Sequence, residues 1–258
     1  MTKGVLDADV LLKMVRKMGH DIRAPLGSLI STSDMLAEGI YGPFNPKQAK
    51  ANERIQRNSR RVLAVLDDFI TYAKAEAEQI DPIPKPFDPR QCLVTCCDQV
   101  RSAAAEKGLS LELTIEQMTP PSLMGDEILI SRIVMALLWN AVAFTHQGGI
   151  SVYSDWTDNS RWLISVQDSG PGIAADIAPH IFEPFWRGED RPQMPTAGAG
   201  LGLPLAQALA HLMQGELVLA QSSPDGSTFY VELPMTTGKN TAKLDIWSMT
   251  EIEPPRLA

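Results

Sequence analysis

Apolar residues recur at alternating spacings of three and four through the first third of the chain, which is the period of an amphipathic α-helix. This pattern predicts one helix over residues 7–38 and a second over residues 46–77, joined by turn-forming residues at 39–46. Two long helices with a short connection form an antiparallel hairpin, whose apolar stripes a second copy can cover. We therefore predict a homodimer through residues 7–77, in which two hairpins close a four-helix bundle. The stripes consist of Leu11, Val15, Met18, Ile22, Leu29 and Leu36 in the first helix and of Ile55, Val62, Leu66, Phe69 and Ala73 in the second.

The pattern changes after residue 80. Residues 81–89 contain four prolines, which predicts a semi-rigid linker. Beyond it, short runs with period two alternate with helical runs, as expected for an α+β sandwich with strands on one face and helices on the other. The predicted helices cover residues 88–107, 126–145 and 201–214, and the predicted strands cover residues 109–115, 149–156, 162–167, 216–221 and 227–233.

These patterns predict two domains. An all-α helical hairpin occupies residues 1–80, a linker follows at 81–87, and an α+β domain occupies 88–234. Residues 235–258 are polar and unpatterned, and we treat them as a tail of unknown role.

Charge and composition narrow the possible partners. The 258 residues carry 23 basic and 31 acidic side chains, a net charge of −8, which argues against a nucleic-acid partner because such a partner requires a basic surface. No apolar run approaches the roughly 20 residues of a membrane helix, and no secretory signal opens the chain. We therefore expect no membrane contact in this chain and a cytoplasmic location. The clustered thiols of Cys92, Cys96 and Cys97 fit that expectation, because reduced cysteines are typical of the cytosol.

A histidine followed by an acid lies inside the first predicted helix. His20 is two residues from both Met18 and Ile22, and at about 100° per residue it therefore faces away from the apolar stripe, toward solvent. Asp21 can accept a proton from one ring nitrogen and leave the other as a nucleophile. Pro25 removes one helical hydrogen bond, so we expect the helix to bend or loosen there.

Three further motifs occur in order in the second domain. Asn140 ends a predicted helix, and its amide oxygen is a hard ligand suited to Mg²⁺ beside phosphate oxygens and water. Asp168 ends a predicted strand, where its carboxylate can accept a hydrogen bond from an adenine amino group. The glycines of residues 168–172 and 198–203 let the backbone approach a ligand closely, and the second set precedes a helix N-terminus, which favours phosphate.

These motifs carry a resemblance to a known family. His-Asp-Ile-Arg-Ala-Pro-Leu at residues 20–26 closely resembles the phosphoacceptor box of sensor histidine kinases. The later motifs resemble, in order, four boxes of the ATP-binding domain of these kinases, which has the Bergerat fold. The N box matches Asn140, the first glycine box residues 168–172, the F box residues 182–185 and the second glycine box residues 198–203. The resemblance spans residues 11–234 and implies ATP and Mg²⁺ as cofactors.

The resemblance also implies a role for each motif residue. Asn140 would hold Mg²⁺ and Asp168 would bind adenine. His20, with Asp21 as its general base, would accept the γ-phosphoryl group of ATP and pass it to an aspartate on the receiver domain of a response regulator. The glycines would shape the adenine pocket (Gly170 and Gly172) and wrap the phosphates (Gly198, Gly200 and Gly202, beside Leu203 of the same box).

The chain departs from the family pattern at two positions. Ala143 replaces a cation of the N box that would contact phosphate. A charge-assisted contact is worth about 1.5–3 kcal/mol, so we expect weaker affinity or turnover unless Arg187 or His146 substitutes. Ala24 replaces the threonine or asparagine that orients water in bifunctional relatives, which predicts weak phosphatase activity toward the regulator.

Two other functions compete with the kinase. A degenerate kinase-like scaffold would bind nucleotide and a response regulator but phosphorylate poorly, and Ala143 is the feature that favours it. A chaperone- or topoisomerase-like ATPase would share the nucleotide fold but would not need a hairpin that presents His20.

Overall fold

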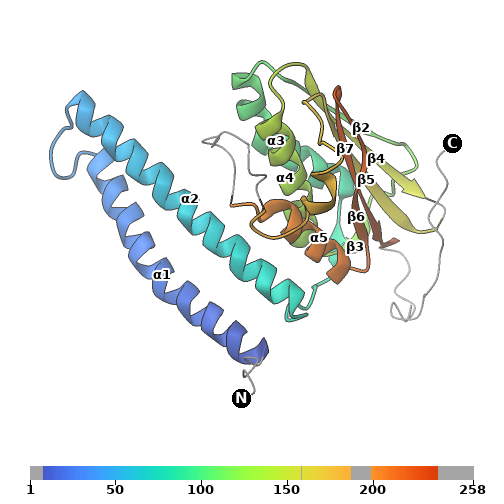
Figure 1. Cartoon of the computed structure of the whole chain (residues 1–258), viewed down its shortest axis with the longest axis horizontal. Coiled ribbons are helices and arrows are strands. Elements are labelled where there is room, and N and C mark those ends of the chain that lie inside the picture. Colours follow the sequence, from blue (N-terminus) through green and yellow to red (C-terminus); the bar gives the residue numbers. More distant parts are fainter. Residues whose placement is uncertain (1–7, 158, 187–198, 238–258) are drawn as a thin grey trace.

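The computed structural model describes residues 8–157, 159–186 and 199–237, and it contains a helical hairpin and an α/β part (Figure 1). The hairpin consists of α1 (Ala8–Ala37) and α2 (Pro46–Glu76), each within one residue of its predicted ends. A capping box begins α2: the Asn45 side chain accepts from the backbone N–H groups of Lys47 and Gln48, and the Gln48 side chain accepts from the Asn45 N–H. Pro25 lies inside α1 without ending it.

A buried polar pair fixes the register of the two helices. The Ser33 hydroxyl donates to Asn52 Oδ1 at 2.6 Å, and Asn52 Nδ2 donates to the Ser33 carbonyl oxygen at 2.8 Å. Both side chains are buried. Since a buried amide without partners is costly, this reciprocal pair favours one alignment of α1 on α2.

Much of the predicted apolar stripe faces away from the interior of the hairpin. Met18, Ile22 and Leu29 of α1, and Ile55 and Val62 of α2, are between 38% and 60% exposed. These five residues, called here the exposed stripe, therefore form an apolar surface on a single hairpin.

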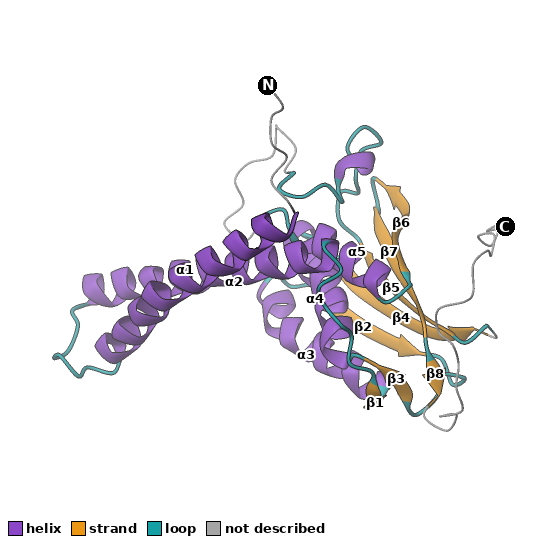
Figure 2. Ribbon diagram, turned by 90° about the horizontal axis from the view of Figure 1, so that it is seen from below, coloured by secondary structure: helices purple, strands orange, loops and turns teal. Residues whose placement is uncertain are grey.

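The second part is a five-stranded sheet covered on one face by three helices (Figure 2). Neighbouring strands are antiparallel except for β2 and β4, which are parallel. Along β5 the side chains alternate, so that Trp162, Ile164 and Val166 point into the core beneath the helices. In sheet order the strands are β2 (Ser110–Ile115), β4 (Gly149–Thr157), β5 (Arg161–Asp168), β7 (Gly226–Pro234) and β6 (Glu216–Ser223). The helices are α3 (Pro89–Glu106), α4 (Glu127–Phe144) and α5 (Gly202–Leu212), and a 3-10 turn spans Ala178–His180.

A second, three-stranded sheet corrects the predicted domain ends. It pairs β1 (Lys85–Phe87) with β3 (Leu123–Gly125) and β3 with β8 (Thr236–Thr237). Residues 85–87, predicted as linker, and residues 236–237, predicted as tail, therefore belong to the α/β part. Phe87 ends β1 and Met235 directly precedes β8, and both side chains are buried in the core of the α/β part. Their burial explains why both segments pack against it.

The end of α2 packs on the α/β part. Ala75 joins the hydrophobic core of that part, and α2 lies against α5. Arg132 of α4 donates to the Thr71 hydroxyl at 2.9 Å, and the rings of Phe69 and Phe185 lie 5.8 Å apart. The hairpin is thus connected to the α/β part by packing as well as by the chain.

Among the described residues, α4 alone is long and apolar enough to cross a membrane. The sequence predicted a helix at residues 126–145, but no apolar run of the length of a membrane helix. Its apolar residues are explained by packing, because one side of α4 is buried in the core between the sheet and the neighbouring helices. The three cysteines are buried free thiols on α3.

Candidate nucleotide and phosphoacceptor sites

The structure places His20 on the outer surface of the hairpin. Its side chain and that of Asp21 are exposed, as the helical spacing predicted. Directly before it, Gly19 is buried, and a Cβ there would overlap the end of the Ile70 side chain. One turn further on, Arg23 forms an ion pair with Asp67 of α2. Close helix packing and this ion pair therefore hold the backbone that presents His20.

Asn140 lies in the last turns of α4. Its side chain and Ala143 are half-buried, whereas Ala141 and Val142 between them are buried in the core. Helical periodicity places Asn140 and Ala143 together on the side of α4 that is turned from the core. In the described residues no group of three or more His, Cys, Asp or Glu side chains could hold a metal ion. A single amide oxygen still fits Mg²⁺, which keeps water and binds nucleotide phosphates as further ligands.

Asp168 is the last residue of β5, and its side chain lies on the helix-covered face of the sheet, with Val166 and Ile164. It is 6% exposed, and Oδ1 accepts the backbone N–H of Gly170 at 2.8 Å. Burial raises the pKa of Asp168, while the backbone N–H groups of Gly170 and Ser227 oppose that shift. A buried carboxylate at a strand end can bind an exocyclic amino group tightly, because water does not compete there.

The glycines that follow Asp168 are required by close backbone contacts. A Cβ at Gly170 would lie 2.7 Å from Asp168 Oδ1 and 3.2 Å from the Phe144 carbonyl oxygen at the end of α4. Gly172 has a φ of +69°, and a Cβ there would overlap the Ser223 carbonyl oxygen. This loop therefore packs closely between the end of α4 and the β6–β7 hairpin, which fixes its position beside Asp168.

The second glycine box leads into α5. Gly200 has a φ of +75°, a Cβ there would be 2.8 Å from the Trp186 carbonyl oxygen, and its own carbonyl oxygen accepts the Phe185 N–H at 2.9 Å. Gly202 is the first residue of α5, and a Cβ built there meets no atom within 4 Å among the described residues beyond its neighbours in the chain and the helix. The start of α5 can therefore receive a phosphate group. Leu203 packs partly against the core.

The structure thus brings the end of α4 to the Asp168 loop and the F box to Gly200. Gly198 and Arg187 lie outside the described residues. Sequence reasoning missed two supporting side chains. The Ser222 hydroxyl accepts the N–H of Ile173 at 2.6 Å and so fixes the loop after Gly172. Lys107 binds the end of α4, and no motif signals either residue.

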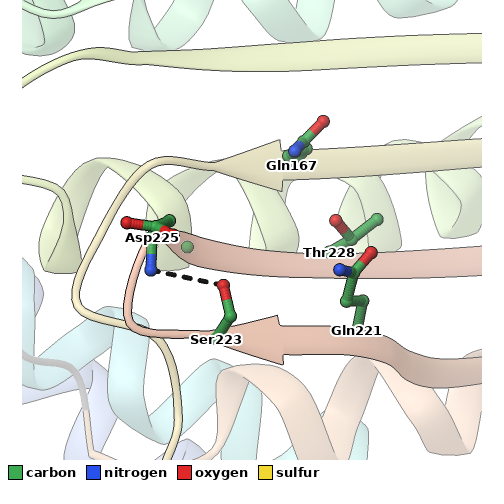
Figure 3. Close-up of a pocket in the computed structure, with 6 residues that line it drawn as sticks. Gln167, Gln221, Ser223, Asp225 and Thr228 are labelled. Atoms are coloured by element: carbon green, nitrogen blue, oxygen red, sulfur yellow. Dashed lines mark hydrogen bonds between the residues drawn. The ribbon is translucent and has the colours of Figure 1, made fainter.

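Two cavities of about 260 Å³ lie on the other face of the sheet. Figure 3 shows the first, at the β6–β7 turn, where Asp225 N–H donates to Ser223 Oγ at 3.2 Å. Gln167 and Thr228 line it, and they alternate along their strands with the buried residues Val166 and Phe229. The first cavity therefore lies on the face opposite to the helices. The second cavity also reaches Asp168 and Ser169 at the end of β5, but neither cavity is lined by Asn140 or Gly200.

The fold and the site define a class of protein with a Bergerat-type ATP-binding domain behind a histidine-bearing helical hairpin. Two family models match the chain: "His Kinase A (phospho-acceptor) domain" at residues 10–78, and "Histidine kinase-, DNA gyrase B-, and HSP90-like ATPase" at residues 125–237. The chain therefore belongs to the sensor histidine kinases and comprises their catalytic core.

Individual relatives agree with this assignment. The chain is 32% identical over 232 residues to hybrid signal transduction histidine kinase F of Dictyostelium discoideum, covering 88% of this chain and 21% of the relative. It is 32% identical over 220 residues to sensor protein TorS of Escherichia coli (strain K12), which covers 84% of this chain and 23% of that relative. The chain thus spans less than a quarter of the length of these two relatives.

A solved structure agrees as well. Full-length ShkA in complex with AMPPNP superposes with a TM-score of 0.76 at 26% identity, over 88% of this chain and 46% of that chain. Both the fold class and the two-domain layout predicted from the sequence are confirmed.

Proposed function

We propose that this chain is an ATP-dependent protein histidine kinase that phosphorylates His20. The observation that carries the proposal is one chain that combines an exposed His20–Asp21 pair on a helical hairpin with a buried Asp168 carboxylate beside the close-packed Gly170–Gly172 loop. A ring nitrogen of His20 attacks the γ-phosphorus of ATP and forms an N–P bond. The bond from the γ-phosphorus to the oxygen shared with the β-phosphate breaks, ADP leaves, and Asp21 accepts the proton of the other ring nitrogen.

The residues present fit ATP with Mg²⁺. Asp168 binds the adenine amino group, Gly170 and Gly172 shape its pocket, and the Gly200–Gly202 segment receives the phosphates. Asn140 is the protein ligand for Mg²⁺, which when bound would offset charge on the phosphates. Gly198 and Arg187 complete the proposed set from outside the described residues.

The exposed stripe supports a homodimer through residues 7–77. Two such stripes can bury each other and close a four-helix bundle, whereas a single hairpin leaves them in water. The proposed partner is a response regulator receiver domain, to whose aspartate the phosphoryl group passes. Arg54 and Arg57 of α2 are exposed and can meet an acidic surface on that domain.

One experiment tests the kinase proposal against its rivals. The dimer is incubated with Mg-ATP labelled at the γ-phosphate, and acid-labile label is measured on wild type and on His20→Gln. Label that saturates near one phosphoryl group per His20 and disappears in His20→Gln supports a kinase. Nucleotide binding without label would instead indicate the scaffold that Ala143 favours, and steady phosphate release without label would indicate an ATPase.

A further inference from the structure

Lys107 directly follows α3 and reaches across to the end of α4. Its ammonium group donates to the carbonyl oxygens of Val142 at 2.6 Å, Ala143 at 3.1 Å and Thr145 at 3.4 Å. The side chain is half-buried. One lysine thus binds three carbonyl groups within about one turn of backbone, 35–38 residues away in the sequence.

These carbonyl groups are the ones that a helix end leaves without helical partners. The Thr145 N–H donates to the Ala141 carbonyl oxygen and is the last helical bond of α4. The last turn of α4, from Ala141 to Phe144, contains no basic residue of its own. The Lys107 ammonium supplies both the missing hydrogen bonds and the positive charge that the C-terminal end of a helix dipole favours.

The end of α4 that Lys107 holds also borders the proposed nucleotide site. Asn140 lies within one turn of Val142 and Ala143, so its position depends on the same helix end. The Phe144 carbonyl oxygen lies between the two Lys107-bound carbonyls of Ala143 and Thr145, and it is so close to Gly170 that a Cβ built on that glycine would lie 3.2 Å from it. If α4 frays there, the Mg²⁺ ligand and the adenine pocket move together.

We propose that Lys107 is a positioning residue for nucleotide binding, which holds the end of α4 so that Asn140 and the Gly170 loop keep the positions that the bound nucleotide requires. It does not touch the nucleotide. The proposal rests on the site assigned under the proposed function, and it adds a residue to that site which no motif contains.

The chain offers a matched control on the same helix. Arg90, near the start of α3, also donates to three carbonyl oxygens, those of Glu116 at 3.1 Å, Gln117 at 3.4 Å and Thr119 at 3.1 Å. These belong to the connection between β2 and β3, outside the proposed nucleotide site. Removal of either cation takes a charged donor from backbone carbonyls, but only Lys107 lies beside the proposed nucleotide site.

The test is the affinity for AMPPNP with Mg²⁺, measured by calorimetry on the full chain, beside the midpoint of thermal unfolding. We expect Lys107→Met to weaken AMPPNP binding about tenfold, as the loss of a charged hydrogen-bond donor does. Lys107→Arg should restore most of the affinity. Arg90→Met should lower the unfolding midpoint and leave the affinity unchanged. Lys107→Gln, which keeps a neutral donor, provides the measurement if Lys107→Met does not fold, and an intermediate loss is expected.

The outcomes separate this inference from the proposed function. If Lys107→Met and Lys107→Gln bind AMPPNP as tightly as wild type while Asn140→Leu does not, the site stands and the role of Lys107 is overturned. Equal losses in Lys107→Met and Arg90→Met would also overturn it, because they would indicate a general loss of stability. Wild-type affinity in Asn140→Leu, which removes the oxygen ligand, would overturn the site itself, and with it the role of Lys107.

Discussion

At the scale of single residues, the carboxylate of Asp168, which is proposed to bind adenine, lowers the stability of the folded state at neutral pH. Burial raises the pKa of its carboxyl, so the folded state holds this proton more tightly than the unfolded state does. The protonated carboxyl therefore adds to the free energy of unfolding. This stabilisation is fully present at pH values below the unfolded-state pKa and is lost as pH rises through the folded-state pKa. At neutral pH the ionised carboxylate thus carries a desolvation cost that an amide would not carry.

Asp168→Asn should consequently be at least as stable as wild type at neutral pH and yet bind AMPPNP far more weakly. The stability difference should shrink as pH falls through the folded pKa of Asp168, because the wild-type carboxyl then becomes neutral. Thermal unfolding over a pH series, with calorimetry of AMPPNP binding, measures both. A variant that is less stable at neutral pH and binds AMPPNP normally would contradict this account.

Gly172→Ala should lower both stability and nucleotide affinity. A left-handed backbone costs a non-glycine residue about 1–2 kcal/mol, and the added methyl group also overlaps the Ser223 carbonyl oxygen. Gly27→Ala is the control, since a Cβ at this helical position of α1 meets no atom within 4 Å. We expect that control to keep wild-type affinity and to be as stable or slightly more stable. Chemical denaturation and AMPPNP titration distinguish the two variants.

At the residue scale, the sequence identified candidate site residues that belong to motifs. It did not identify residues whose partners are backbone groups of another element. His20, Asn140, Asp168 and the described glycines were identifiable because their side chains, or the lack of one, carry the chemistry. Lys107 was not identifiable, since its partners are carbonyl groups whose position depends on how α3 packs against α4.

At the scale of elements, the hairpin depends on one buried polar pair. Asn52→Ala would leave the buried Ser33 hydroxyl without its partner, which costs about 1–3 kcal/mol. We expect a lower unfolding midpoint for Asn52→Ala and partial recovery in the double variant Ser33→Ala/Asn52→Leu, which removes both polar groups. The control is Gln48→Ala, which affects only the exposed cap of α2. Equal stability of Asn52→Ala and wild type would refute the role of the pair.

The long helices and the five strands of the main sheet followed from periodicity, but three short strands did not. β1, β3 and β8 have two or three residues each, too few for an alternating pattern to be visible. Their pairing joins residues 85–87, 123–125 and 236–237, which the chain alone does not bring together. The parallel pairing of β2 with β4 likewise depends on tertiary packing.

At the scale of the whole molecule, the exposed stripe is the basis of the proposed dimer. Met18→Glu or Val62→Glu places a charge in the proposed bundle interior, and we expect either variant to be monomeric in sedimentation velocity experiments. Val94→Glu is the control, because Val94 is an exposed apolar residue of α3, outside the hairpin. A monomeric wild type, or dimeric stripe variants, would contradict the four-helix bundle.

The central claim is that ATP bound at Asp168 phosphorylates His20. After incubation of the dimer with Mg-ATP, mass spectrometry at neutral pH should find one phosphoryl group on the peptide that contains His20. It should find none in His20→Gln or in Asp168→Asn. A phosphoryl group on another residue, or an unmodified His20 in a dimer that binds AMPPNP, would contradict the account.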